Sequence, residues 1–337
     1  MIKIAIVGGS GYSGKELIRL LLRHPSAEIV SIFAKTTAGK KISDLYPVFR
    51  GRIDLEIQNF DVSRLDSADL VFLALPHGES MSVIPHLMVA GKKVIDLSGD
   101  FRFPDVRIYE QWYGLPHRAE EWLPRFVYGL PELFRSEING AAAIANPGCY
   151  PTASILGLAP ILSLTDQVNQ PMIVNALSGV SGAGRKAALD FSYCEVNESI
   201  RAYRIGSHQH TPEIAYYLEK HSGRSAQVVF VPHLVPMSRG IYTTIYVRFR
   251  SDFDLDAVRA HYARFYADSP FVRLSENPPE IQNVVYTNVC DIGISADQTH
   301  DCLIVNTAID NLVKGAAGQA IQNMNLMYHL KEEEGLL

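Results

Sequence analysis

The chain has few of the features that mark secreted, membrane or nucleic-acid-binding proteins. Its 337 residues include only four cysteines, far apart and without a Cys-x-x-Cys pair, so we expect neither a disulfide framework nor a zinc site. No apolar run reaches membrane-spanning length, and a strand-like segment starts at Ile2, which leaves no room for a signal peptide. A net charge of -5 without a basic tract argues against a nucleic-acid partner. These absences predict a cytoplasmic protein that binds neither membranes nor nucleic acid.

The chain is long enough for two domains, and its two halves differ in pattern. In the first half, apolar strands alternate with helical segments, which is typical of an α/β protein with a doubly wound parallel sheet, a Rossmann fold. The expected strands are 2–7, 28–33, 69–75, 93–97 and 141–145, and the expected helices are 13–22 and 79–90. Residues 100–139 interrupt this rhythm and are expected to be an insertion of loops and short turns.

The second half indicates an α+β domain with a mixed, largely antiparallel sheet. Residues 240–250 alternate between an apolar and a polar face, as expected for a long strand. Further strands are expected at 228–231, 284–290 and 302–308, and a last helix at about 313–330. An open face of this sheet would be suited to self-association.

Cys149 follows the expected strand 141–145 and a Pro-Gly turn, and Pro151 opens a helix that runs to about residue 162. Proline suits the first helical position, so Cys149 falls at or just before a helix N-terminus. Unpaired N–H groups and the helix dipole stabilise a thiolate there, and a thiolate can attack an acyl carbon. Cys194, Cys290 and Cys302 are expected to be small buried hydrophobic residues instead.

A glycine loop (residues 8–14, Gly-Gly-Ser-Gly-Tyr-Ser-Gly) follows the first strand and opens the first helix. Its glycines allow a tight turn and close approach to a pyrophosphate at the helix N-terminus, although the spacing is GxxGxxG rather than GxGxxG. The second strand ends at Lys35 and Thr36, where an NAD enzyme usually has an acidic residue. A cation and a hydroxyl fit a 2′-phosphate, so we expect NADP(H), unless Lys35 is only a solvated surface residue.

Another strand is followed by Pro76 and His77, which should lie near the adenosine or the nicotinamide, although His77 is equally compatible with a loop residue without a role. The expected cofactor contacts in the first half are Gly8, Ser10, Gly11, Tyr12, Ser13, Gly14, Lys35, Thr36, Pro76 and His77.

Two histidines, His208 and His210, precede a helix expected at 212–221 with Thr211 as its cap. His210 is then just outside a helix N-terminus, where positive potential keeps imidazole neutral, as a general base must be. Glu213 either orients a histidine or complements the helix dipole. No third or fourth ligand has a spacing that supports a metal site.

A serine–glycine loop (residues 178–184) followed by Arg185 has the composition of an anion cradle, because glycines expose backbone N–H groups. Arg102 offers a second guanidinium for a carboxylate or phosphate. The expected cofactor contacts here are Ser178, Gly179 and Gly182, and the expected substrate contacts are Arg102, Asn146, Ser181 and Arg185.

Seven sequence blocks together resemble the N-acetyl-γ-glutamyl-phosphate reductase family, in its order and over essentially the whole chain. They are GGSGYSG, LPHG, DLSGDFR, NPGCYPT, SGVSGAGRKA, HQHTPEI and IDNLVKGAAGQAIQNMN, of which NPGCYPT is highly specific. The resemblance implies a Rossmann domain over 1–147 completed by the C-terminal helix 312–337, and a catalytic domain over 148–311 that forms a homodimer or homotetramer. It matches Cys149 to the family nucleophile and His210 to the base, with His208 as the alternative. Gln209 departs from relatives, which often carry Arg or Lys, so a cationic phosphate contact from this position is in doubt.

The resemblance implies an NADPH-dependent oxidoreductase of arginine biosynthesis. It would reduce an acyl phosphate, N-acetyl-glutamyl 5-phosphate, to the 5-semialdehyde through a cysteine thioester and release inorganic phosphate. A relative in lysine synthesis acts on carrier-bound aminoadipyl phosphate, but Tyr150-Pro151 and Arg185-Lys186 favour the arginine enzyme. Aspartate-semialdehyde dehydrogenase shares the chemistry without the Cys-Tyr-Pro-Thr context. A sensor or scaffold that binds NADP would need neither the cysteine nor the histidine pair.

Overall fold

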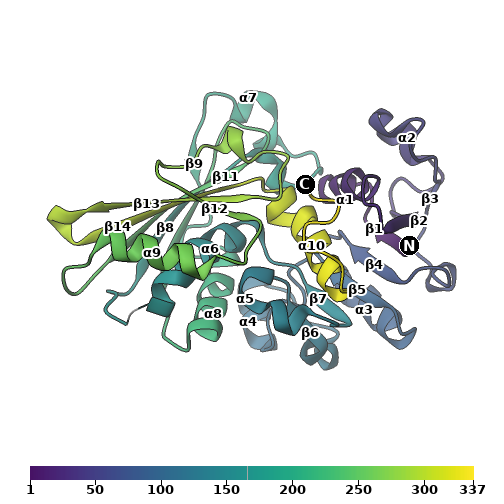
Figure 1. The fold of residues 1–337 in the computed structure, drawn as a ribbon. Coiled ribbons are helices and arrows are strands. Elements are labelled where there is room, and N and C mark those ends of the chain that lie inside the picture. The colour runs from purple at the N-terminus through teal and green to yellow at the C-terminus, as the bar shows by residue number, and fades with distance from the viewer. Residues whose placement is uncertain (165) are drawn as a thin grey trace. The chain divides into compact units, whose positions relative to one another are not determined.

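The computed structural model describes residues 1–164 and 166–337, which form two compact units (Figure 1). The first unit consists of Met1–Gly148 and Ala316–Leu337, and the second of Cys149–Gly315. Each unit contains one seven-stranded sheet. The C-terminal segment thus returns to the unit in which the chain began.

The sheet of the first unit is parallel throughout, in the order β3-β2-β1-β4-β5-β7-β6. Its strands are β1 Ile2–Val7, β2 Ala27–Phe33, β3 Ile57–Gln58, β4 Leu70–Leu73, β5 Lys93–Asp96, β6 Phe126–Tyr128 and β7 Ala143–Ala145. Its helices are α1 Tyr12–Leu21, α2 Ile42–Leu45, α3 Ser80–Val89, α4 Val106–Tyr113, α5 Pro131–Ile138 and α10 Gly318–Met327. The central strands are buried, which explains why they read as nearly continuous apolar runs.

The strand order of this sheet reverses between β1 and β4. Right-handed crossovers from β1 to β2 and from β4 to β5 therefore place α1 and α3 on opposite faces. Helix α10 packs against α1, α5 and β5, which is how the C-terminal segment completes the unit. Open parallel sheets bind ligands beyond the carboxyl ends of the strands at such a reversal.

The expectation that residues 100–139 form only loops and turns is wrong. This stretch contains α4, β6 and α5, and β6 pairs in parallel with β7 at the edge of the sheet. Strand β6 has only three residues, which are too few for a periodic signal. Helix α4 is amphipathic, with Asp105 as its N-cap and Gly114 as its C-cap, so its signal was present in the sequence and was overlooked.

The second unit contains a mixed sheet in the order β12-β13-β14-β11-β8-β10-β9. Its strands are β8 Met172–Ser178, β9 Arg201–Ala202, β10 Val228–Leu234, β11 Ile241–Arg248, β12 Val272–Ser275, β13 Cys290–Asp297 and β14 Cys302–Ile309. Only the β8–β10 and β12–β13 pairs are parallel. The expected fold class, a Rossmann sheet plus an α+β unit with a mixed sheet, is confirmed.

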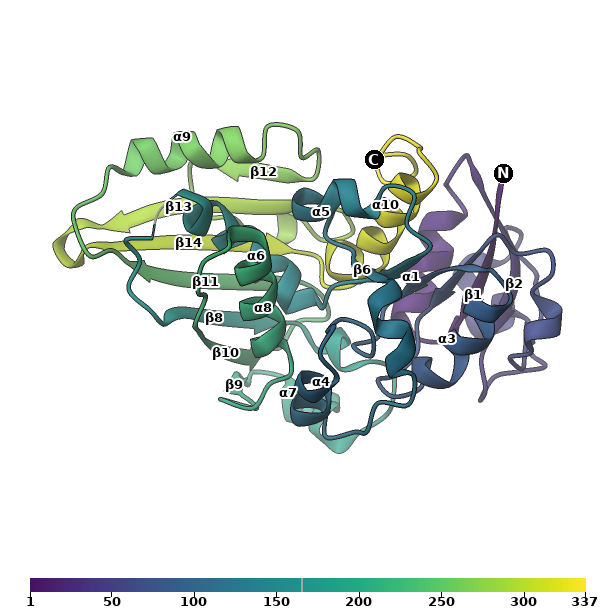
Figure 2. The same ribbon diagram turned by 90° about the horizontal axis from the view of Figure 1, so that it is seen from below.

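The helices of the second unit are α6 Cys149–Leu164, α7 Tyr193–Val196, α8 His210–Ser222 and α9 Leu255–Phe265. Helices α6, α8 and α9 pack together and against one face of the sheet (Figure 2). On the opposite face, alternate side chains of β8, β10 and β11 stay partly exposed, and Ile173 and Val229 are exposed. This face keeps apolar residues in contact with solvent.

Three expected elements of the second half need correction. The strand expected at 284–290 is a turn, and β13 only begins at Cys290. Helix α8 begins at His210, so Thr211 lies inside it and is not its cap, because a proline is tolerated anywhere in the first turn. The last helix is not continuous, since a π-helical turn, Val313–Ala317, precedes α10.

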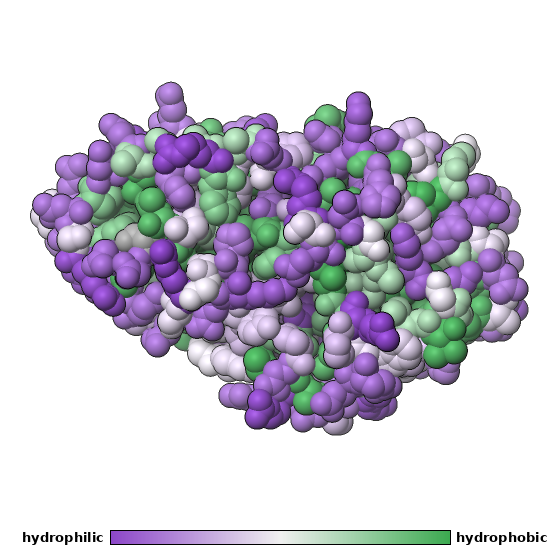
Figure 3. Space-filling model, turned by 60° about the horizontal axis from the view of Figure 1, so that its bottom comes forward, coloured by the Kyte–Doolittle hydropathy of each residue, from purple (hydrophilic) through white to green (hydrophobic). Residues whose placement is uncertain are grey.

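Among the described residues no helix is both long enough and apolar enough to cross a membrane. The face drawn in Figure 3 mixes hydrophilic and hydrophobic residues throughout.

Candidate functional site

The candidate nucleophile, Cys149, is the first residue of α6 and is partly exposed. Almost all of the helix behind it is buried, and its first turn carries no acidic residue that would oppose a thiolate. Cys290 is buried, as expected, whereas Cys302 is only partly buried and Cys194 is exposed on α7. The expectation of a buried Cys194 is therefore wrong, because its short helix lies in an exposed stretch of chain.

Both candidate histidines lie at the start of α8, beside the residue that follows Cys149. The ring of Tyr150 meets the rings of His208 and His210 edge-on, with centroid distances of 5.7 and 5.9 Å. The two imidazole rings are 4.7 Å apart. Because α6 and α8 pack together, the second unit brings Tyr150, the residue after Cys149, into contact with both histidines, which lie about sixty residues further along the chain.

The hydrogen bonding of His208 fixes its tautomer. The backbone N–H of His210 donates to His208 Nδ1 at 3.1 Å, so the ring proton of neutral His208 is on Nε2. Burial, with a smaller contribution from Arg204, lowers the pKa of His208 to about 4. His208 is thus a neutral imidazole that supports the start of the helix carrying His210.

Glu213 is fully buried in α8, three residues after His210 and therefore on the same face of the helix. This full burial disfavours the alternative in which Glu213 is only a surface charge that complements the helix dipole. Its position is consistent with orienting His210.

Sequence reasoning missed Tyr203, which lies just after β9. Its hydroxyl donates to the Tyr150 hydroxyl at 3.2 Å, and Tyr150 donates to the carbonyl oxygen of His233 at 3.3 Å. Burial raises the pKa of Tyr150 and raises that of Tyr203 to about 12, so both stay protonated. No pattern in the sequence points to Tyr203, because its link to Tyr150 spans 53 positions.

The serine–glycine loop begins where β8 ends. Ser178 is buried, and a Cβ on Gly179 would lie 2.8 Å from the backbone nitrogen of Arg239, so only glycine fits there. Ser181 is partly exposed, whereas Gly182 and Arg185 are exposed. The loop therefore has a packed base and an accessible tip, as an anion-binding loop requires.

The glycine loop in the first unit forms a tight cradle at the strand-order reversal. Gly8 has a φ of +89°, and a Cβ there would lie 2.2 Å from the carbonyl oxygen of Ala74, which follows β4. A Cβ on Gly14 would lie 2.4 Å from the carbonyl oxygen of Gly8. Helix α1 starts at Tyr12 without a side-chain cap or an acidic residue in its first turn. Its N–H groups and positive dipole end are thus suited to a pyrophosphate.

The other expected contacts of the loop are accessible: Ser10, Gly11 and Ser13 are partly exposed and Tyr12 is exposed. Lys35 and Thr36 are exposed at the end of β2. A hollow of about 560 Å³ begins at Ala38, two residues after Thr36, and is also lined by Glu56, Asp61 and Arg64. Arg64 is a second cation that sequence reasoning missed, because it is far from Lys35 along the chain.

Gln319 is a further missed candidate for the cofactor. It is fully buried in α10, yet neither its amide oxygen nor its amide nitrogen has a hydrogen-bond partner among the described residues. Orphaned buried amides are rare, because each unsatisfied group costs about 1–3 kcal/mol. An amide-bearing ligand would satisfy both atoms, so this side chain fits a nicotinamide.

Of the remaining expected contacts, His77 and Pro76 are exposed, and His77 Nδ1 accepts from the backbone N–H of Gly99 at 2.8 Å. Arg102 is buried, and its Nε donates to the carbonyl oxygen of Asn146 at 2.8 Å. The Asn146 amide donates to the carbonyl oxygen of Ala316 at 3.2 Å and accepts from Asn323 at 3.1 Å. Asn146 thereby ties the end of β7 to α10 and to the π-helical turn before it.

Two buried carboxyl groups, Asp96 and Asp100, hold the loops that follow β4 and β5. Asp96 accepts from the hydroxyls of Ser80 and Ser98 at 2.8 and 2.7 Å. Asp100 accepts from the backbone N–H of Gly78 at 2.8 Å. Burial, with repulsion from Asp100, raises the pKa of Asp96 to about 7, and burial also raises that of Asp100. Folding thus opposes ionisation of this pair.

Because the folded-state pKa of Asp96 lies above the unfolded value of 3.8, its contribution to stability is complete below about pH 4 and is lost as the pH rises to about 7. In the wild type, the free energy of unfolding should fall between pH 5 and pH 8. We expect Asp96→Asn to make this fall smaller by on the order of 2 kcal/mol. Urea unfolding followed by tryptophan fluorescence measures this, since Trp112 and Trp122 both lie in the first unit. The exposed Asp66→Asn is the control, and identical pH slopes in wild type and Asp96→Asn would refute the prediction.

A metal centre has no support in the part of the chain that the structure describes. No group of three or more His, Cys, Asp or Glu side chains there could hold an ion.

Comparison with known proteins gives two domain matches and full-length relatives. Residues 3–141 match the semialdehyde dehydrogenase NAD binding domain, and residues 149–311 match the semialdehyde dehydrogenase dimerisation domain. The N-acetyl-gamma-glutamyl-phosphate reductases of Desulforudis audaxviator and Citrifermentans bemidjiense are 48% and 49% identical over 340 residues, covering 100% of this chain and 98% of each relative. The first half therefore contains a domain of the nicotinamide-dinucleotide-binding type.

Solved structures with lower identity show the same fold. Aspartate semialdehyde dehydrogenase II of Vibrio cholerae, in complex with ASA, has a TM-score of 0.75 at 18% identity and covers 98% of both chains. Aspartate semialdehyde dehydrogenase of Candida albicans, with NADP, has a TM-score of 0.72 at 16% identity and covers 98% of this chain and 99% of its own. The resemblance found in the sequence blocks is confirmed: the chain belongs to the semialdehyde dehydrogenase family and, within it, to the N-acetyl-γ-glutamyl-phosphate reductases.

Proposed function

We propose that this protein reduces N-acetyl-glutamyl 5-phosphate to N-acetyl-glutamate 5-semialdehyde with NADPH, a step of arginine biosynthesis. The observation that carries the proposal is in the second unit, where a partly exposed thiol opens α6 and the next residue, Tyr150, contacts two buried histidines, of which His208 is neutral. The names of its relatives give the substrate.

The thiolate of Cys149 attacks the acyl carbon of the substrate. A carbon–sulfur bond forms, the bond from carbon to the phosphate oxygen breaks, and inorganic phosphate leaves. The resulting thioester is a better hydride acceptor than a carboxylate. When bound, NADPH would supply the hydride, with its two electrons, that reduces the thioester carbon. The tetrahedral adduct then collapses, the carbon–sulfur bond breaks, and the aldehyde and the Cys149 thiolate are released.

His210 is the proposed base. It accepts the Cys149 proton before attack and returns a proton as the adduct collapses. His208, uncharged and bonded to the His210 backbone, holds this helix start in place. Glu213, on the same face of α8, orients the His210 ring. The N-terminal end of α6, with its positive dipole end, is suited to stabilise the oxyanion of the adduct.

The dinucleotide is held by the first unit. The glycine loop and the start of α1 take the pyrophosphate, while Lys35 and Thr36 take the 2′-phosphate. Gln319 offers its amide to the carboxamide of the nicotinamide. Ser181 and Arg185, both in the second unit, are the proposed contacts for the phosphate and carboxylate groups of the substrate.

The assay that tests the function is phosphate-dependent NADP reduction with N-acetylglutamate 5-semialdehyde. Aspartate semialdehyde and the aminoadipate analogue serve as parallel substrates, because the same thiol chemistry would act on each. We expect kcat/KM for the acetylated substrate to exceed the other two by at least about 100-fold, the scale of a few specific polar contacts. A higher value for either alternative would overturn the substrate assignment.

We expect Lys35→Ala to raise the KM for NADPH about fivefold, the scale of one exposed ion pair, and to leave the KM for NADH unchanged. The reason is that only NADPH carries the 2′-phosphate that the Lys35 ammonium would meet. Lys40→Ala is the matched control, an exposed lysine of the same loop whose removal should affect neither coenzyme. An equal loss with both coenzymes after Lys35→Ala would rule out this role.

We also propose that the protein is a cytoplasmic homodimer or homotetramer. Support comes from the apolar face that β8, β10 and β11 leave partly exposed and from the match of residues 149–311 to a dimerisation domain. The presence of four free cysteines fits a reducing compartment.

A further inference from the structure

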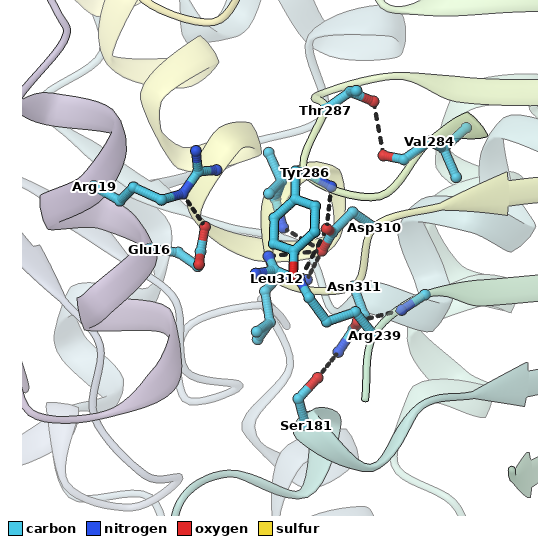
Figure 4. A network of polar contacts seen from close by, with 12 residues as sticks. Glu16, Arg19, Ser181, Arg239, Val284, Tyr286, Thr287, Asp310, Asn311 and Leu312 are labelled. Carbon is cyan, nitrogen blue, oxygen red and sulfur yellow. Dashed lines mark hydrogen bonds and ion pairs between the residues drawn. The ribbon is translucent and has the colours of Figure 1, made fainter. Parts of the chain in front are cut away.

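Two consecutive polar residues, Asp310 and Asn311, follow β14 and are buried in the second unit (Figure 4). Buried polar side chains are costly unless they are hydrogen bonded, so their partners show what the burial achieves. Neither residue belongs to the catalytic groups described above. Asn311, however, is hydrogen bonded to Ser181, and Asp310 is hydrogen bonded to Gly315, whose backbone lies against Cys149.

Asp310 anchors the chain that follows it. Its carboxylate accepts from the backbone N–H groups of Leu312 and Tyr286 at 2.8 and 2.6 Å, and it pairs with Arg239 Nε at 3.0 Å. Its backbone carbonyl accepts from the N–H of Gly315 at 2.9 Å. A Cβ on Gly315 would lie only 2.8 Å from the Cβ of Cys149. The segment 310–315 is thus held rigidly beside the nucleophile.

The amide orientation of Asn311 follows from its two partners. The backbone N–H of Gly240, which can only donate, donates to Asn311 Oδ1 at 2.8 Å. The other amide atom is therefore Nδ2, and it donates to Ser181 Oγ at 3.0 Å (Figure 4). Asn311 is thus a fixed donor toward the Ser181 hydroxyl.

The base of the serine–glycine loop is held by main-chain bonds, independently of this contact. The N–H of Gly179 donates to the carbonyl oxygen of Gly240 at 2.9 Å, and the N–H of Ser181 donates to that of Ser238 at 3.2 Å. The backbone of the loop therefore does not depend on the Asn311 side chain. What that side chain determines is the direction of one hydroxyl.

We propose that Asn311 is a positioning residue that directs the Ser181 hydroxyl proton toward the phosphoryl oxygen of the substrate. Because Ser181 Oγ accepts from Asn311, its own proton points away from Asn311, and Ser181 is partly exposed. A hydroxyl that already accepts a hydrogen bond is a stronger donor to a second partner. This inference rests on the proposed function, which supplies the phosphoryl group.

The test inverts the polarity of this hydrogen bond without changing its shape. In Asn311→Asp, one carboxylate oxygen still accepts from Gly240, but the other accepts from the Ser181 hydroxyl and draws its proton away from the substrate. With full-length enzyme, N-acetylglutamate 5-semialdehyde and varied inorganic phosphate, we expect the KM for phosphate to rise roughly 10–100-fold, the effect of losing a hydrogen bond to a charged group. The KM for NADP should stay within about twofold, because the expected loss is confined to the phosphate contact.

A double-mutant cycle separates positioning from a general effect on the fold. Ser181→Ala alone should raise the KM for phosphate. The double variant, with Asn311→Asp added, should have the same KM for phosphate as Ser181→Ala. Lowering the pH should reduce the difference in the KM for phosphate between Asn311→Asp and wild type, because a protonated carboxyl group can again donate to Ser181. The charged groups of this network that face the new carboxyl are Asp310 and Arg239, which pair with each other.

If Asn311→Asp does not fold, Asn311→Ala is the second variant, and its smaller effect should likewise vanish in the Ser181→Ala background. An unchanged KM for phosphate in an active Asn311→Asp enzyme would overturn the inference. So would an equal rise in this KM when Asn311→Asp is introduced into the wild type and into Ser181→Ala. A wild-type enzyme without phosphate-dependent activity would instead refute the proposed function itself.

Discussion

Replacing Cys149 by serine is expected to lower turnover by on the order of 10⁴-fold or more, while NADP binding stays close to that of the wild type. Serine has nearly the same shape, but its hydroxyl does not ionise near neutral pH, so the helix start has no anion to stabilise. The cofactor cradle at Gly8 and Gly14 belongs to the first unit and does not depend on the sulfur. Turnover is measured as phosphate-dependent NADP reduction and binding by fluorescence titration.

Cys194→Ser provides the matched control, since Cys194 is exposed and belongs to the second unit, as Cys149 does. It should retain full activity. Thiol labelling adds an independent measurement: Cys149 should alkylate faster than Cys194 although it is less exposed, because reactivity follows thiolate content. Activity near the wild-type level in Cys149→Ser would end the thioester proposal, and slower labelling of Cys149 would argue that the helix start does not activate it.

The second large effect is expected at His210. His210→Asn should lower kcat by roughly 10²–10⁴-fold, the usual contribution of a general base. His208→Asn should cost far less, because the asparagine side-chain oxygen can still accept from the backbone N–H of residue 210, as His208 Nδ1 does. His208→Ala, which removes that acceptor, should cost more than His208→Asn.

The pH profile distinguishes the roles of the two histidines. His208, with a pKa lowered to about 4, is already neutral above about pH 5 and so contributes no ionisation in the neutral range. The fall of kcat/KM on the acidic side of the pH profile should therefore remain as in the wild type in His208→Asn and should be altered in His210→Asn. The opposite result, a larger loss and an altered acidic side of the profile in His208→Asn, would make His208 the base.

Much of the fold could be predicted from local sequence. The glycine loop between β1 and α1 and the alternation along β11 have periodicities and turn residues that act within a few positions. The strand β6 and the turn at 284–290 could not be predicted, because their conformation is set by neighbours rather than by their own pattern. Helix α8 begins two residues before the position that the sequence predicts, since Pro212 is compatible with either start.

The same division holds for the candidate site. Cys149 stands out because its activation depends on a helix start, which the Pro-Gly turn and Pro151 encode locally. Tyr203, Gln319 and Arg64 gave no signal, because a buried hydroxyl network, an orphaned amide and the wall of a hollow exist only after distant segments have packed.

By itself, the sequence determined the class of fold, the glycine cradle, the candidate nucleophile and the family, because each depends on residues adjacent in the chain. Only the tertiary structure decided that His208 is neutral, that Gly315 packs against Cys149, and that Asn311 donates to Ser181 across 130 positions. The physical reason is that burial and hydrogen-bond direction depend on which distant groups exclude water from one another, and that is settled only when the chain packs.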